Sequence, residues 1–242
     1  MDASFEHVPA IPPRIVRDVP RLDPIWLKRF AEVSSCDIGD HVGRLYTIEG
    51  VEALYRPIQR MVGQALTVKP WPGDGLAVHG AASLAQDGDV LVVDARGYTG
   101  VTGAGFKMLA GPRARGLRGY VIDGALRDVE DFQEVGFPVF GRGRAVHSST
   151  KRRPGEINVP VSIGGVIVEA GDLIVGDGDG MVVVPRAHIA TIWELVSAGP
   201  PPVPTDPEEI AAADAKRREN YERAFEREAG VETAFVDRTP GN

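Results

Sequence analysis

The feature that most constrains the fold is a series of short apolar runs that alternate with helical patterns in the middle of the chain. Val90–Val93 is an apolar run between turn signals, and such a run suits a strand that is buried on both faces. Helical patterns separate this run from similar ones, and that order favours parallel strand pairing in an α/β sheet. The expected strands are residues 64–69, 90–94, 119–122 and 137–140, and the expected helices are residues 75–84, 105–115 and 129–135.

The sequence patterns near the two ends of the chain differ from those in the middle. Residues 1–20 are rich in proline and aperiodic, and a helix near 24–33 and a short helix that carries Asp40 should follow them. After residue 141, short strands separated by glycines indicate a small antiparallel or mixed sheet. Asp206 and Pro207 form the start signal of a C-terminal helix. We therefore divide the chain into an N-terminal arm (1–20), a single α/β domain (21–196), a proline-rich linker (197–206) and a C-terminal helix with its tail (207–242).

Composition narrows the classes of function. The net charge of −7 and the 43% of hydrophobic residues predict a globular protein without a nucleic-acid partner. The single cysteine, Cys36, excludes an intrachain disulfide and fits a reducing compartment. Because the N-terminus lacks a signal-peptide pattern and no segment approaches the ~20 apolar residues of a membrane helix, we expect a cytoplasmic protein with no membrane partner.

Several common site patterns are incomplete. Gly100, Gly103 and Gly105 miss the spacing of a dinucleotide fingerprint, although a glycine-rich loop at a helix start can hold a carboxylate through its amides. The five histidines form no zinc-binding pair, and there is no G-x-S-x-G elbow. The Asp177–Gly180 segment lacks the glutamate of a calcium loop, so we interpret it as a tight turn.

The most informative segment runs from Gly116 to Asp131. A buried strand ends near Asp123, and Arg127 and Asp128 follow at its carboxyl end, the edge where open α/β sheets bind ligands. The residues alone leave two interpretations open. Either Asp128 caps a helix and Arg127 makes a surface ion pair, or the two side chains belong to a ligand site.

This segment resembles the signature of the family that contains the class II 4-hydroxy-4-methyl-2-oxoglutarate aldolases and the regulator of ribonuclease activity A. That signature is a glycine well ahead of an Arg-Asp pair, which two residues separate from an acid. Gly105 precedes Arg127 by twenty-two residues, and Arg127-Asp128-x-x-Asp131 matches the pattern. The resemblance extends over residues 34–190 and includes the segments 63–68, 88–94, 137–140 and 171–185.

The resemblance implies an α/β fold, a layered β-β-α sandwich with a mixed sheet, assembled as a homotrimer or a dimer of trimers. It also implies a carbon–carbon lyase of the aldolase or oxaloacetate decarboxylase type. Such an enzyme uses Mg²⁺ or Mn²⁺ and releases pyruvate from a small 2-oxo acid through an enolate. Carried over, Asp128 anchors the metal, Arg127 holds the substrate and Asp131 supports the metal's waters. The substrate-binding loop is Gly105, Phe106, Lys107 and Met108, in which the amides of Lys107 and Met108 hold the carboxylate.

One departure puts the substrate and the aldol activity in doubt. Phe106 stands where many of these aldolases carry an acid. The general base stays open between a metal-bound water and a glutamate of a neighbouring subunit's C-terminal helix (Glu219, Glu222 or Glu226), with Lys107 as a further general acid/base candidate. The alternative function is a non-catalytic regulator that binds another protein, in the manner of the ribonuclease regulators. An intact Arg127-Asp128 pair disfavours that alternative, because a pure binder has no need of a metal anchor.

Overall fold

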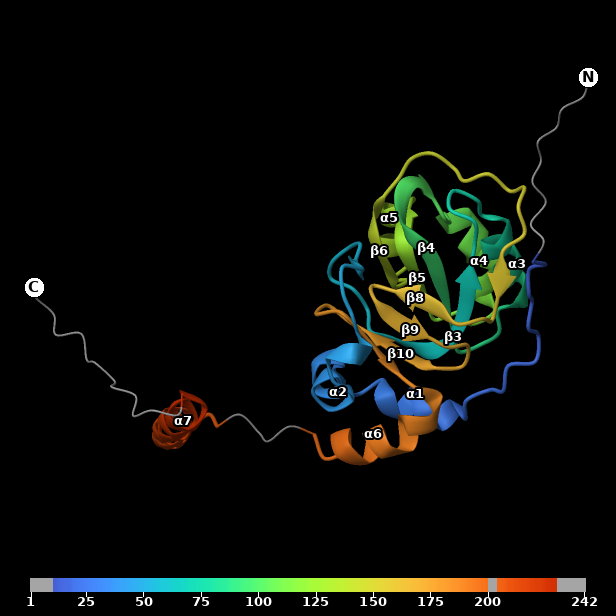
Figure 1. Cartoon of the computed structure of the whole chain (residues 1–242). Coiled ribbons are helices and arrows are strands. Elements are labelled where there is room, and N and C mark those ends of the chain that lie inside the picture. The colour runs from blue at the N-terminus through green and yellow to red at the C-terminus, as the bar shows by residue number, and fades with distance from the viewer. Residues whose placement is uncertain (1–10, 200–203, 230–242) are drawn as a thin grey trace, which may run out of the picture. The chain divides into compact units, whose positions relative to one another are not determined.

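The computed structural model describes residues 11–199 and 204–229. The chain divides into two compact units, Met1–Gly199 and Pro200–Asn242. The first unit contains the sheets and helices α1 to α6, and the second contains helix α7 (Pro207–Ala229) (Figure 1). None of the helices in the described residues is both long enough and apolar enough to cross a bilayer.

A large mixed sheet forms the centre of the first unit, with the strand order β1-β11-β10-β3-β4-β5-β6-β2 and with β7 paired to β3. Strands β3 to β6 are parallel, as the alternating apolar runs predict. Their bounds are β3 (Met61–Lys69), β4 (Asp89–Thr102), β5 (Gly119–Leu126) and β6 (Val139–Arg144). The shorter strands are β1 (Thr47–Ile48), β2 (Glu52–Ala53), β7 (Glu156–Ile157), β10 (Leu173–Gly176) and β11 (Met181–Val184).

The separate sheet expected after residue 141 is only partly correct. Strands β8 (Val161–Ile163) and β9 (Val166–Val168) do form a hairpin of their own. Strand β10, however, pairs antiparallel with β3, and β11 pairs antiparallel with β10, so both extend the main sheet. The glycines between these strands mark where each one ends, but they carry no information about which neighbour it pairs with.

Alternate residues of the central strands pack on opposite sides of the sheet. Leu91 and Val93 of β4 belong to a core with residues of α3, α4 and α5, whereas Val90 and Val92 pack with the β8–β9 hairpin. Helices, sheet and hairpin therefore form three layers, which is the β-β-α arrangement that the resemblance implies (Figure 1). A third core holds α1, α2 and α6 against β10 and β11. The helices are α1 (Pro24–Phe30), α2 (Ser35–Val42), α3 (Leu76–Leu84), α4 (Phe106–Ala114), α5 (Val129–Glu134) and α6 (Ile189–Val196).

Local capping explains where several helices begin. The carboxylate of Asp23 accepts a hydrogen bond from the Ile25 amide, and the Ser34 hydroxyl accepts one from the Asp37 amide. The carboxylate of Asp206 accepts from the amides of Glu208 and Glu209, so the expected start of α7 is confirmed. Helix α6 had no counterpart among the expected helices. Of the arm, linker and tail, residues 1–10, 200–203 and 230–242 lie outside the described residues.

The Asp177–Gly180 segment is the turn between β10 and β11, as interpreted from the sequence. The Asp177 amide donates to the Gly180 carbonyl at 2.9 Å. The Asp177 carboxylate accepts from the amide and the hydroxyl of Ser35 at 2.8 and 2.6 Å. These bonds attach the turn to the start of α2. They give the Asp177 carboxylate a structural role in the fold.

Candidate active site

The candidate site lies where β4 and β5 end side by side, at the carboxyl edge of the parallel strands. The Gly103 amide donates to the Ala125 carbonyl at 2.8 Å, and the Arg127 amide donates to the Ala104 carbonyl at 3.4 Å. These two bonds continue the pairing beyond the regular strands. They bring the glycine-rich loop before α4 against the Arg127–Asp128 pair before α5.

Gly105 packs directly on the two signature side chains. A Cβ atom at this position would lie 2.5 Å from Oδ2 of Asp128 and 3.0 Å from Nε of Arg127. The backbone of Gly105 is extended, with φ −139°, so its conformation alone would suit any residue. The requirement for glycine here is therefore steric, and it exists only because Arg127 and Asp128 lie against the loop.

Asp128 does not cap its own helix. Its backbone adopts the left-handed conformation, with φ 62°, and its side chain makes no capping bond to α5. Instead, Oδ2 accepts a hydrogen bond of 3.0 Å from the Phe106 amide, the first residue of α4. The partial positive charge at the start of α4 stabilises a carboxylate in that position. Of the two interpretations left open by the sequence, simple capping of α5 is therefore excluded.

The guanidinium of Arg127 is held by the chain segment that follows β6. Its Nη1 donates to the Ser148 hydroxyl at 2.8 Å and to the Val146 carbonyl at 3.4 Å. Its Nε lies 3.8 Å from Oδ2 of Asp128, and its side chain is 43% exposed. Arg127 thus combines a fixed position with donors that face solvent. The sequence did not predict a role for Ser148, because no motif near residue 148 indicates a contact with Arg127.

In the substrate-binding loop predicted at residues 105–108, the amides of Phe106 and Met108 are paired, whereas those of Gly105 and Lys107 have no acceptor among the described residues. The Met108 amide donates to the Gly105 carbonyl at 3.1 Å. Within the described part of the chain, the Lys107 amide has no hydrogen-bond acceptor, so it is better placed than the Met108 amide to bind a carboxylate. The Phe106 ring packs edge-on against Phe132 of α5, 5.3 Å between ring centroids, and so fastens α4 to α5.

A metal ion at this site would have one protein carboxylate as its anchor. Among residues 11–199 and 204–229, no group of three or more His, Cys, Asp or Glu side chains is placed to hold a metal. Oδ1 of Asp128 makes no hydrogen bond to any described residue, and Asp131 is exposed on α5. Mg²⁺ is commonly held by one or two carboxylates together with waters and oxygen atoms of the substrate. The donor set therefore fits Mg²⁺ or Mn²⁺ bound in that manner.

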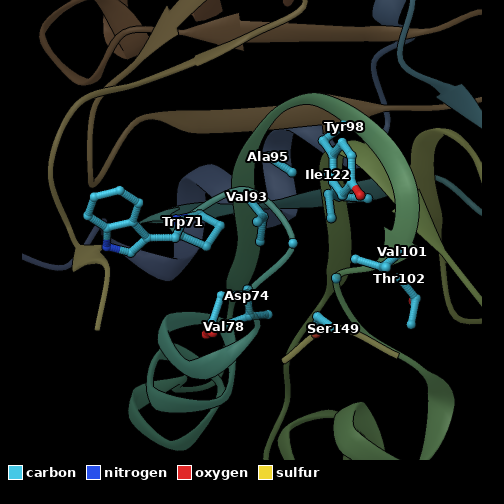
Figure 2. Close-up of a pocket in the computed structure, with 13 residues that line it drawn as sticks. Trp71, Asp74, Val78, Val93, Ala95, Tyr98, Val101, Thr102, Ile122 and Ser149 are labelled. Atoms are coloured by element: carbon cyan, nitrogen blue, oxygen red, sulfur yellow. The ribbon is translucent and has the colours of Figure 1, made fainter. Parts of the chain in front are cut away.

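A small pocket lies behind the loop, lined by Asp74, Tyr98, Thr102, Gly103 and Ser149 among others (Figure 2). Its volume of about 10 Å³ corresponds to a single water molecule. A 2-oxo acid does not fit there.

Comparisons with known proteins identify the relatives of this chain. A family-wide sequence profile described as "RraA-like: Aldolase/RraA" matches residues 35–183. A Halalkalibacterium halodurans protein, named provisionally as a 4-hydroxy-4-methyl-2-oxoglutarate aldolase, is 38% identical over 163 residues, which are 67% of this chain and 78% of that protein.

Two solved structures share the fold. One is Streptomyces coelicolor RraAS2, described as an unusual member of the RNase ES inhibitor RraA protein family. It is 28% identical with a TM-score of 0.64, over 85% of this chain and 99% of that one. The other is the RNA-processing inhibitor RraA from a Thermus species, 26% identical with a TM-score of 0.55, over 64% of this chain and 94% of that one.

Proposed function

The chain belongs to the RraA-like family, which is described as Aldolase/RraA, and from that premise we propose that it is a carbon–carbon lyase that acts on a small 2-oxo acid with Mg²⁺ or Mn²⁺. The observation that carries the proposal is the convergence of Gly105, Arg127 and Asp128 on one exposed surface. The Arg127 guanidinium, the Asp128 carboxylate and the Lys107 amide lie together there, and neither Oδ1 of Asp128 nor the Lys107 amide bonds to any described residue. The name of the Halalkalibacterium halodurans relative supports the same class of reaction.

The chain's own residues would bind and orient the substrate. Arg127 would donate in-plane N–H groups of its guanidinium to the carboxylate and the keto oxygen of the 2-oxo acid. The Lys107 amide, at the positive end of α4, would donate to the same carboxylate. When bound at Asp128, a divalent cation would supply Lewis acidity toward the keto oxygen. These groups all favour negative charge on the 2-oxo acid fragment.

That charge is what the reaction generates. In a retro-aldol cleavage the carbon–carbon bond next to the hydroxyl-bearing carbon breaks, and its electron pair passes to the 2-oxo acid fragment. The hydroxyl loses its proton and becomes a carbonyl. Decarboxylation of oxaloacetate gives the same fragment, with CO₂ as the other product. Because Arg127 is already held in place, it stabilises the developing charge with little reorganisation.

We also propose that the protein is cytoplasmic and assembles as a homotrimer or a dimer of trimers. The side chains of Arg127 and Asp128 are 43% and 32% exposed in the single chain. A neighbouring subunit would supply walls to a site as open as this one and exclude water from it.

The decisive experiment is an assay of pyruvate release from 4-hydroxy-4-methyl-2-oxoglutarate and oxaloacetate, with Mg²⁺ and with EDTA. We expect turnover only with the metal, and Asp128→Asn should lower kcat/KM by at least about 100-fold because it weakens the metal anchor. Glu130→Gln, on the exposed first turn of α5, is the matched control and should retain activity. Full turnover in EDTA would overturn the metal-dependent proposal.

Asp131→Asn separates a supporting role from an anchoring one. If Asp131 orients waters of the metal site, its variant should lose about 10- to 100-fold in metal affinity or activity, less than Asp128→Asn. An Asp131→Asn variant that matches Glu130→Gln would remove Asp131 from the site.

The second candidate function is protein-binding regulation without catalysis. It is favoured by the similarity to the Thermus protein, which is described as an RNA-processing inhibitor, and to the Streptomyces protein, which is described as an unusual member of an RNase inhibitor family. Absence of turnover on every 2-oxo acid tested, together with direct binding to a purified ribonuclease, would favour it over the lyase.

A further inference from the structure

The orientation of Arg127 depends on a chain segment that has little regular structure of its own. The Arg127 guanidinium donates hydrogen bonds to the Ser148 hydroxyl and the Val146 carbonyl. Both acceptors lie in the chain segment that follows β6. A long, half-exposed arginine without such acceptors would sample many rotamers, and fixing it on substrate binding would cost conformational entropy. What holds residues 146–153 therefore decides how well Arg127 is preorganised.

One end of the 146–153 segment is attached to the glycine-rich loop. The Thr102 amide donates to the His147 carbonyl at 2.8 Å, next to Ser148. Thr102 immediately precedes Gly103, the residue that pairs with the end of β5. The 146–153 segment therefore contacts both the glycine-rich loop and Arg127 at the candidate site.

The other end of the segment is attached to a buried carboxylate, Asp74. This side chain is only 6% exposed and accepts three bonds from the segment, at 2.7 Å from the Thr150 hydroxyl, 2.8 Å from the Arg152 amide and 3.2 Å from the Arg153 amide. It also accepts from the Leu76 amide at 2.9 Å, at the start of α3. Backbone bonds of Thr150 to Gly73 and Gly75 flank it. Figure 2 shows Asp74 and Ser149 among the residues around the small pocket.

The Asp74 carboxylate is well suited to hold this segment. Burial works to raise the pKa of Asp74, but the bonds from Leu76, Arg152, Thr150 and Arg153 outweigh burial and leave the pKa below its usual value. The anion therefore persists at neutral pH. Only an anion with two acceptor oxygens can satisfy four donors here, because an amide would present a single oxygen.

We propose that Asp74 and Ser148 are positioning residues of the candidate active site, which act through Arg127 by holding the 146–153 segment against its guanidinium. Neither needs to touch the substrate. The inference rests on the proposed function, because it assigns Arg127 to the binding of a 2-oxo acid.

The test is the affinity for pyruvate, measured in saturating Mg²⁺ by calorimetry on the full chain. We expect Asp74→Asn and Ser148→Ala each to weaken pyruvate binding by about tenfold, and Ser148→Thr to restore it because threonine keeps the hydroxyl. In an Arg127→Ala background, neither Asp74→Asn nor Ser148→Ala should weaken binding further, since their effect passes through the missing guanidinium.

Two controls separate positioning from simple loss of stability. Asp172 is equally buried and accepts from the amides of Glu169 and Arg186. It bonds to Ala65 of β3, which pairs with Val90 near the start of β4, away from the strand ends that form the candidate site. Asp172→Asn also removes a buried carboxylate, and it should leave pyruvate affinity unchanged. Ser83→Ala, which removes an exposed hydroxyl bonded within α3, is the matched control for Ser148→Ala.

The possible failures are distinguishable. If Arg127→Ala leaves pyruvate binding intact, the substrate role of Arg127 in the proposed function is wrong. If Arg127→Ala weakens binding but Asp74→Asn and Ser148→Ala behave like their controls, or add their full effect in the Arg127→Ala background, the positioning inference is wrong.

A readout without substrate keeps the inference testable on its own. The guanidinium NMR signal of Arg127, identified by its loss in Arg127→Lys, should show slow rotation in the wild type and in Asp172→Asn. Fast rotation in Asp74→Asn and Ser148→Ala would support the inference, and unchanged slow rotation would overturn it.

Discussion

At the residue scale, the glycine of the signature is explained by its neighbours. Gly105 is needed because Oδ2 of Asp128 and Nε of Arg127 occupy the space that a Cβ atom would take. Gly111 lies in helix α4, which follows Gly105. A Cβ atom at Gly111 would lie 3.7 Å from Nη1 of Arg115, which is an ordinary contact. The two glycines therefore form a natural pair for comparison.

Gly105→Ala should lower kcat/KM by about 100-fold, because the added methyl group displaces Asp128 and Arg127 from the positions in which they act together. Gly111→Ala should leave activity intact and stabilise the protein by about 0.5–1 kcal/mol, since alanine favours the helix. Steady-state kinetics and urea unfolding of both variants check the pair. Equal activity of Gly105→Ala and the wild type would show that the close approach is unimportant.

The hydroxyl of Tyr120 makes a second residue-scale prediction. Tyr120 is fully buried, its hydroxyl has no hydrogen-bond partner among the described residues, and burial raises its pKa. Tyr120→Phe should therefore raise the free energy of unfolding by about 1 kcal/mol, because it removes an unsatisfied polar group and keeps the ring. Urea denaturation measures the change. A loss of more than about 1 kcal/mol would show that a buried water binds this hydroxyl.

At the element scale, Asp123 joins three parts of the fold. It lies on β5, forms an ion pair with Arg142 of β6 and accepts a bond of 3.0 Å from the Gly164 amide in the β8–β9 hairpin. Burial works to raise the pKa of Asp123, but the bonds from Arg142, Gly164 and Gly97 and the charge of Arg142 outweigh it and lower the pKa from 3.8. A lowered pKa means that the folded state prefers the ionised carboxylate.

The stabilisation by Asp123 is therefore fully present above the unfolded-state pKa near 3.8 and is lost as the pH falls through the lower folded-state pKa. Asp123→Asn should cost about 2–3 kcal/mol at pH 7, because it leaves Arg142 without its partner. The unfolding free energy of the variant should also fall less than that of the wild type between about pH 5 and pH 3. Denaturation at both pH values measures this, with Asp87→Asn at an exposed ion pair as the control. Identical pH slopes for Asp123→Asn and the wild type would contradict the assignment.

At the scale of the whole molecule, the three hydrophobic cores all belong to the first unit. Helix α7 is polar, and its larger apolar side chains, Ile210, Tyr221 and Phe225, are 47%, 60% and 58% exposed. The stability of the first unit should therefore depend little on residues after Gly199.

A chain that ends at Gly199 should unfold within about 3 °C of the full protein, because no core residue is removed. Its pyruvate turnover then tests whether a glutamate of α7 takes part in the reaction. Differential scanning calorimetry and the pyruvate assay provide the two measurements. A large drop in Tm would show that α7 contributes to the stability of the assembled protein.

The sequence determined those features that depend on neighbours along the chain. The apolar runs at residues 64–69, 90–94, 119–122 and 137–140 predicted the parallel strands, because a buried strand must be apolar on both faces. The Asp206–Pro207 signal placed the start of α7, because capping bonds reach only two or three residues. The Arg127-Asp128 pair was identified through its motif and its place after a strand.

Only the tertiary structure decided which distant segments meet. It placed β10 beside β3, showed that Asp128 binds the start of α4 rather than its own helix, and attached Asp74 to residues 150–153. Each of these contacts joins positions more than twenty residues apart, so no local propensity encodes it. Their geometry follows from the packing of helices and hairpin on the two sides of the sheet, which brings the strand ends, and the loops that follow them, to one edge.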